Sequence, residues 1–327
     1  MNTRGYLLLL LGLGLFIGLL IYYGLDDIFS AMSVMGWGLG VVVASHLLPL
    51  FIDCLSWRFL FVWERIPGFH HILYSRWIGE AVNALLPSAQ VAGDVVRARI
   101  LALHGYSPVH AGASVFTEIA VALISQTIFA LIGIVCLMII GCRTVILNGM
   151  IGFVILIGFF ALFFFAYRRG FWSGLIGLLS VLVGKERMQE ISGSAEAMDQ
   201  AIREIYQHKG SVAIAVVLRL IGWMAGAVEV WVALWFLDSD PSVPKALLLE
   251  SLGHMIRGAA FLVPGAIGVQ EGGFVFLGSL VGLTPEISLS VSLSKRVREL
   301  VLGIPALLAW QIEEGRNLFF RQIKRKR

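Results

Sequence analysis

Ionisable side chains stand inside several apolar stretches of this sequence, where a charge is costly and therefore informative. Glu271 lies in LVPGAIGVQEGGF, residues 262–274, a stretch without a basic residue. Arg296 and Glu299 are three residues apart inside another apolar run, so they share a helical face and can pair. A charge in hydrocarbon costs at least about 2.5 kcal/mol and normally faces a cavity or a partner. These residues therefore indicate a polar site within a membrane.

The composition agrees with a membrane protein. The 327 residues are 58% hydrophobic and only 14% charged, whereas soluble domains are about 25% charged. Several apolar runs approach or exceed the roughly 20 residues that span a bilayer as a helix. We predict an all-α integral membrane protein whose apolar runs cover 5–24, 37–62, 77–93, 109–141, 145–167, 211–237, 246–282 and 286–311.

Basic residues are distributed unevenly among the loops. They gather in 58–76, 94–108, 168–209 and the tail RQIKRKR, whereas the loops 25–36, 238–245 and 283–286 contain Lys245 alone. Since Lys and Arg mark cytoplasmic loops, we predict a multi-pass protein with both termini in the cytoplasm.

Two of the apolar segments do not fit as plain spans. Segment 77–93 has basic flanks at both ends, and segment 246–282 has non-basic flanks at both ends. Each therefore returns to the side from which it enters, and both carry residues that break a helix. The breakers are Pro87, Gly93, Pro264, Gly265 and Gly268. We predict two opposed re-entrant hairpins, as in an inverted repeat; the alternative is a pair of proline-kinked spanning helices.

This topology divides the chain into three parts. Residues 1–167 form a first membrane half that contains hairpin 77–93, and residues 210–327 form a second half with hairpin 246–282 and the basic tail. Between them, segment 168–209 contains apolar residues spaced by threes and fours from 185 to 209. That spacing predicts an amphipathic helix, which we interpret as a cytoplasmic linker between the halves.

The candidate binding residues are intramembrane charges and their helical neighbours. Asp94 and Arg97 can pair at i, i+3, with a solvated helix start as the alternative, and Glu250, His254 and Arg257 form one helical stripe. His46, Asp53 and Arg58 are interpreted as structural or interfacial, and Arg219 as either functional or snorkelling. Arginines between helices suit a phosphate or another anionic group. The candidates are Asn83, Asp94, Arg97, Glu118, His254, Arg257, Glu271, Arg296 and Arg298.

No motif for catalysis, nucleotide binding or metal binding is visible. The three cysteines have no ligand spacing, so we expect neither a disulfide framework nor a zinc site. We therefore expect no metal, no cofactor and no catalytic residue, and a membrane lipid rather than a nucleic acid as the partner.

Two stretches carry a family resemblance. NALLPSAQVAGDVVRARIL and FLVPGAIGVQEGG resemble the signature stretches of the flippase-like membrane domain of lysylphosphatidylglycerol synthases. The chain looks most similar to stand-alone members such as the hopanoid-cluster membrane proteins. The resemblance assigns Asn83, Pro87, Gly93, Asp94 and Arg97 to the first motif and Pro264, Gly265, Gly268 and Glu271 to the second. The basic position of the last helix falls on Arg296 or Arg298. The helix after the first motif keeps Glu118 but lacks the arginine and aspartate that usually follow.

The resemblance implies lipid translocation in the bacterial inner membrane. We expect a flippase that moves a lipid with a polar or anionic headgroup, a hopanoid or a phospholipid among the options. We expect no aminoacyl-transferring activity, because no soluble domain of that kind is present in the sequence. The alternatives are an intramembrane lipid-modifying enzyme and a non-catalytic scaffold of a lipid-biosynthesis complex. The sequence does not decide whether the protein forms homo-oligomers or binds lipid-biosynthesis proteins.

The topology can be tested by cysteine labelling. In a cysteine-free background, single cysteines at residues 27, 243 and 284 should react with a membrane-impermeant maleimide from outside. Those at residues 76, 98 and 325 should react only from the cytoplasmic side. Labelling of 27 and 325 from the same side would contradict the topology. If the two flanks of a predicted hairpin are labelled from opposite sides, that segment crosses the membrane as a plain span.

Overall fold

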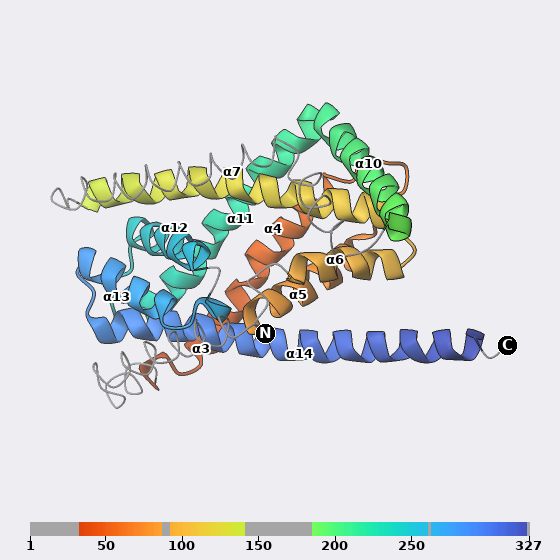
Figure 1. Cartoon of the computed structure of the whole chain (residues 1–327). Helices are drawn as coiled ribbons and strands as arrows, with labels where there is room; N and C mark the ends of the chain where they lie inside the picture. The colour runs from red at the N-terminus through yellow and green to blue at the C-terminus, as the bar shows by residue number, and fades with distance from the viewer. Residues whose placement is uncertain (1–32, 87–91, 141–184, 261–262, 326–327) are drawn as a thin grey trace.

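The computed structural model describes residues 33–86, 92–140, 185–260 and 263–325, and within these ranges its regular elements are all helical (Figure 1). This confirms the predicted all-α class. Apolar runs 5–24 and 145–167 and the breaker Pro87 lie outside the described residues. The helices are α3 Gly38–Ser45, α4 Leu47–Arg58, α5 Phe69–Leu85, α6 Ala92–Leu103, α7 Pro108–Ile140, α10 Lys185–Gln207, α11 Lys209–Phe236, α12 Val243–Ala259, α13 Val269–Leu280 and α14 Pro285–Arg325, with a 3₁₀ turn, η1, at Pro264–Ala266.

Three stretches of the described chain are long and apolar enough to cross a membrane. They are Gly38–Arg58, formed by α3 and α4, then Pro108–Ile140 and Lys209–Phe236, with 21, 33 and 28 residues. Their outward faces expose large apolar side chains, for example Ile128 on α7 and Val217 on α11. Charges are buried and apolar groups exposed, which is the reverse of a soluble protein. The chain is a membrane protein.

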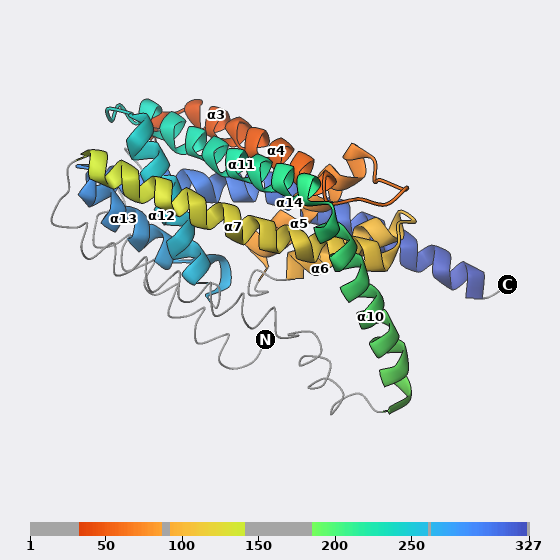
Figure 2. The same ribbon diagram turned by 90° about the horizontal axis from the view of Figure 1, so that it is seen from above.

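Two helical hairpins lie among these long helices. In the first, α5 packs against α6, and in the second, α12 packs against α13. The free ends of α5 and α6 lie at the end of the bundle that also holds α10 and the C-terminus, whereas α12 begins and α13 ends at the opposite end (Figures 1 and 2). Their re-entry into a membrane stays a prediction, but the arrangement has the geometry that re-entry requires.

The first hairpin begins earlier than the sequence suggested. Helix α5 starts at Phe69 rather than near residue 77, so Arg76 is inside the helix and only 4% exposed. Counting Arg76 as a loop residue was wrong, because its charge is matched by carboxylates within the bundle instead of by water. The exposed Ile66, in the loop before α5, is the better labelling position for this flank.

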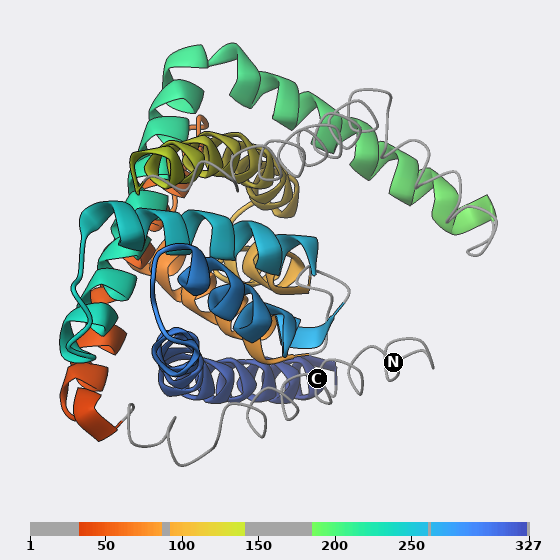
Figure 3. The same ribbon diagram turned by 90° about the vertical axis from the view of Figure 1, so that its left-hand side faces the viewer.

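The packing of the two halves follows one pattern. Helix α4 packs on α5, α5 on α6 and α6 on α7, just as α11 packs on α12, α12 on α13 and α13 on α14. Across the halves, α5 packs on α14 and α12 packs on α7. The long helices α7 and α14 run in opposite directions, with the hairpins between them (Figures 1 and 3). This repetition supports the predicted inverted repeat.

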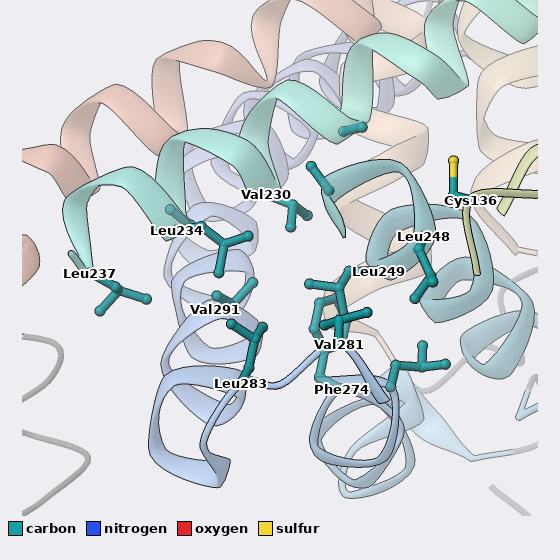
Figure 4. Close-up of a cluster of buried hydrophobic side chains, with 14 of the residues drawn as sticks. Cys136, Val230, Leu234, Leu237, Leu248, Leu249, Phe274, Val281, Leu283 and Val291 are labelled. Atoms are coloured by element: carbon teal, nitrogen blue, oxygen red, sulfur yellow. The ribbon is translucent and has the colours of Figure 1, made fainter. Parts of the chain in front are cut away.

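Two apolar clusters hold the ends of the bundle together. One joins α7, α11, α12, α13 and α14, with Leu234, Leu249 and Phe274 at its centre (Figure 4). The other surrounds Trp57 and Ile72 and is covered by α10 through Ile205. Helix α10 confirms the amphipathic helix predicted at 185–209. A third, smaller cluster joins α5, α6 and α14 around Ile78 and Ile100.

A glycine contact closes the first hairpin. A Cβ atom on Gly93 would overlap the carbonyl oxygen of Gly79, so the two helix backbones touch where only glycine fits. The side chain of Asn83 spans the same gap, because its Oδ1 accepts a hydrogen bond of 2.8 Å from the Gly93 N–H. The breaker Gly93 therefore serves close packing of the hairpin.

Gly93→Ala should destabilise the protein by about 1–3 kcal/mol, because the added methyl group forces the hairpin apart. The measurement is thermal unfolding of the detergent-purified protein, followed by tryptophan fluorescence. Gly40→Ala is the matched control, since a Cβ there meets nothing within 4 Å, and it should be neutral or slightly stabilising. Equal melting temperatures for wild type and Gly93→Ala would refute the contact.

Candidate functional site

A charged cavity of about 410 Å³ lies at the centre of the bundle. Helices from both halves line it, and Gly222 and Gly226 of α11 give room for the carboxylates of Asp53 and Glu250. Its apolar lining includes Trp77 and Trp223. Its ionic lining comprises six acids, Asp53, Glu80, Asp94, Glu118, Glu250 and Glu299, five arginines, Arg76, Arg97, Arg219, Arg257 and Arg298, and the histidines His46 and His254.

Arg76 is the centre of the network in the first half. Its Nε donates to Glu80 Oε1 at 3.0 Å, its Nη1 to Glu118 Oε1 at 2.9 Å and its Nη2 to Asp53 Oδ2 at 3.0 Å. One guanidinium thereby connects α4, α5 and α7. Only arginine has the planar fork of donors that can hold three carboxylates in fixed directions.

Two further arginines complete this first network. Arg97 Nη2 donates to Asp94 Oδ1 at 2.6 Å and to Glu118 Oε2 at 2.9 Å, which confirms the predicted i, i+3 pair. Its guanidinium also lies 4.9 Å from the ring centroid of Trp57. Arg219 of α11 contacts Asp53 and lies 4.5 Å from the ring centroid of Trp223. Arg219 is therefore a buried member of the network and does not snorkel.

The second network joins α11, α12 and α14. Lys295 Nζ donates to Glu250 Oε2 at 2.6 Å, and Arg298 Nη1 donates to Glu229 Oε2 at 3.2 Å. Arg257 Nη1 contacts Glu299 and donates to the Gln270 side chain at 2.8 Å. The charges of the last helix therefore have carboxylate partners on other helices, as a buried charge requires.

His46 connects the two networks. It stands at the break between α3 and α4, with its ring nitrogens 3.6 Å from Glu80 Oε2 and 3.4 Å from Glu229 Oε2. Arg298 Nη1 also contacts the ring. The second cavity histidine, His254, is hydrogen-bonded to Glu250 at 3.0 Å. His46 thus lies where carboxylates of both halves meet, although its sequence position suggested a structural residue.

The tip of the second hairpin is held by Glu271. The chain turns through Gly265 at φ 62° and Gly268 at φ 80°, both in the left-handed region that favours glycine. Glu271 Oε2 accepts from the Gly268 N–H at 2.7 Å, and its Oε1 accepts from Arg296 Nε at 2.9 Å. Arg296 also donates to the Gly265 carbonyl at 2.7 Å. The predicted break and restart are confirmed, with α12 ending at Ala259.

This geometry corrects one expectation about Glu271. We expected its carboxylate to face the central cavity, but Glu271 is 0% exposed and is not part of the lining. It caps α13 and pairs with Arg296, which likewise lies outside the lining. Of the two last-helix arginines, Arg296 pairs with Glu271, whereas Arg298 belongs to the lining of the cavity.

The other candidate residues, apart from Arg296, lie together in the lining of the cavity. The lining includes the predicted Asn83, Asp94, Arg97, Glu118, His254, Arg257 and Arg298. The candidate list lacked seven ionic residues of the lining: His46, Asp53, Arg76, Glu80, Arg219, Glu250 and Glu299. The one available signal was an ionisable residue within an apolar run, which applied to all of these except Arg76. The described residues contain no group of three or more His, Cys, Asp or Glu side chains arranged to hold a metal ion.

The fold and the cavity define a helical membrane protein with a paired-charge chamber inside its bundle. The chain matches the lysylphosphatidylglycerol synthase TM region family over residues 9–306. It belongs to this family, as the two signature stretches indicated. Neither curated proteins nor solved structures gave a match.

The Glu271–Arg296 pair can be tested by a double-mutant cycle. Glu271→Gln and Arg296→Gln should each destabilise the protein by about 3–5 kcal/mol, because each leaves a buried partner uncompensated. The double variant should lose less than the sum of the two. The measurement is unfolding of the detergent-purified variants. In the control cycle, the exposed pair Asp240 and Lys245, 3.1 Å apart, should give a coupling below about 1 kcal/mol. Additive losses for the buried pair would contradict the tip geometry.

Proposed function

We propose that this protein is a lipid transporter of the flippase type, which moves a lipid with a polar headgroup across the bacterial inner membrane. The observation that carries the proposal is the cavity, because it offers polar surface inside a bundle whose exterior is apolar. A headgroup can cross there while its acyl chains stay in lipid. Membership of a family named for a lipid synthase supports a lipid as the cargo.

The two hairpins give this proposal its mechanism. They start from opposite ends of the bundle, and their tips approach each other, with the Ala84 carbonyl close to Gly265. We propose that both are re-entrant and that each covers the cavity from one side. Rocking of one half against the other would then expose the cavity alternately, as in transporters built from inverted repeats.

The orientation rests on the loops. The loop between α4 and α5, which follows Arg58 and contains Arg65, lies at the same end of the bundle as α10 and the C-terminus, whereas the loops after α11 and α13 lie at the other end (Figure 2). We propose that the basic end is cytoplasmic. Residues 168–209 would then link the two halves along the cytoplasmic surface.

The residues have distinct roles in this proposal. Arg257 and Arg298 attract the phosphate of the headgroup, and Asn83 adds a neutral hydrogen-bonding group to the lining. Arg97 and Glu118 hold the first hairpin to α7, and Glu271 and Arg296 hold the second hairpin's tip. In this proposal, the charged residues that contact the lipid are different from those that hold the hairpins in place.

Translocation by the purified protein tests the proposal. Vesicles containing trace lipid with an acyl-chain fluorophore should transfer that lipid between leaflets, as dithionite quenching measures, with no change in lipid mass. Arg257→Gln should slow transfer about ten-fold or more, because it removes a charged contact to the headgroup. Arg65→Gln is the matched control; Arg65 is exposed and donates to the Gly105 carbonyl, so its loss should leave the rate unchanged.

Other results would decide against transport. A covalently altered lipid would favour an intramembrane enzyme acting through the cavity carboxylates. Lipids that neither move nor change would favour a scaffold. Equal transfer rates for wild type and Arg257→Gln would show that the cavity is not part of the transport path.

A further inference from the structure

The exposed charges of the cavity differ in sign between the two networks. In the first network, the arginines are covered: the side chains of Arg76, Arg97 and Arg219 are 5%, 6% and 8% exposed. Two of its acids are more open, Glu80 at 37% and Asp94 at 21%, whereas Glu118 is 3% exposed. A ligand that enters on this side meets carboxylates.

The second network has the opposite arrangement. Its acids are covered, with the side chains of Glu229, Glu250 and Glu299 at 1%, 3% and 7%. Cavity-facing Arg257 is 15% exposed and Arg298 is 10% exposed. The contacts of Arg257 with Gln270 and Glu299 both use Nη1, which leaves Nε and Nη2 for a ligand. A ligand on this side meets hydrogen-bond donors.

Both networks contain buried polar atoms without a hydrogen-bond partner. Among the described residues these include the acceptors Asp53 Oδ1 and Glu229 Oε1 and the donors Arg219 Nε and Arg298 Nε. Asp53 and Arg298 both belong to the cavity lining and are 9% and 8% exposed. Buried polar atoms without partners are unusual and call for an explanation, such as a ligand that completes them. The two networks together therefore leave both acceptors and donors for a ligand to complete.

We infer that the cavity binds a zwitterionic phospholipid headgroup that carries a primary ammonium and a phosphate. The ammonium lies between Glu80 and Asp94, and the phosphate lies at Arg257 and Arg298. This inference rests on the proposed transport function and names its substrate class. An ammonium has three N–H donors for carboxylate oxygens, whereas a quaternary ammonium has none. A headgroup with a phosphate alone would leave the open carboxylates repelling it.

The experiment compares three lipids in the same vesicles with the full chain. Trace acyl-chain-labelled phosphatidylethanolamine, phosphatidylglycerol and phosphatidylcholine are followed one at a time by dithionite quenching. Phosphatidylethanolamine should move about ten-fold faster than phosphatidylglycerol, the difference expected from one good charged contact. It should also move faster than phosphatidylcholine, and it should raise the melting temperature of the purified protein more than either.

Variants then assign the ammonium side. Glu80→Gln combined with Asp94→Asn should lower the rate ratio of phosphatidylethanolamine to phosphatidylglycerol toward one. Glu64→Gln is the control, because Glu64 is an exposed acid of the same half outside the cavity and should preserve the ratio. If the double variant does not fold, Asp94→Asn alone should lower the ratio in the same direction.

The outcomes separate the inference from the function beneath it. Faster movement of phosphatidylglycerol, or equal movement of all three lipids, would overturn the zwitterionic substrate while transport stands. A ratio unchanged in the acidic variants would overturn the assignment of the ammonium. Movement of no lipid at all would overturn the transport function itself.

Discussion

The structure depends on the cost of placing charge inside a membrane. An ionised side chain at the bilayer centre costs at least about 2.5 kcal/mol unless it has a partner or a polar cavity. This chain places more than a dozen such groups in its interior, and each arginine of the cavity contacts a carboxylate. Every helix that brings a charge must therefore meet another that brings the opposite one. The order in which the helices pack is the arrangement that satisfies this requirement, and the apolar clusters stabilise its ends.

The two hairpins satisfy the requirement in different ways. The first is closed by backbone contact between Gly79 and Gly93, and the aliphatic part of the Arg97 side chain packs against Gly79. The tip of the second is held by Glu271, which binds a backbone N–H and an arginine of another helix at once. The halves share a packing pattern while their tips use different chemistry. This difference fits the polarity of the cavity, whose open charges are acidic on one side and basic on the other.

Local spacing made part of this structure predictable. The breakers in segment 246–282 indicated the turn at Gly265 and Gly268, because glycine at positive φ leaves a clear mark in sequence. The pair Asp94–Arg97 and the stripe ending at Arg257 followed from helical geometry alone. Arg76 was assigned to a loop because the apolar run appeared to begin after it. The contact of Asp53 with Arg219 joins helices far apart in the chain, and no local pattern carries that information. Glu271 was placed in the cavity because its capping of α13 depends on the exact turn of the chain.

The near balance of the interior charges has an electrical consequence. The cavity lining contains six acids and five arginines, and their contacts tie them into pairs and triads. A membrane potential acts on net charge, at about 2.3 kcal/mol per elementary charge for each 100 mV. When an acid and its arginine partner move together, they carry no net charge. The electrical work on one partner then cancels the work on the other. A headgroup without net charge adds nothing to this sum. The proposed transport of a headgroup without net charge would therefore be close to voltage-independent, and its direction would be set by the lipid concentrations of the two leaflets instead of by the electrical gradient.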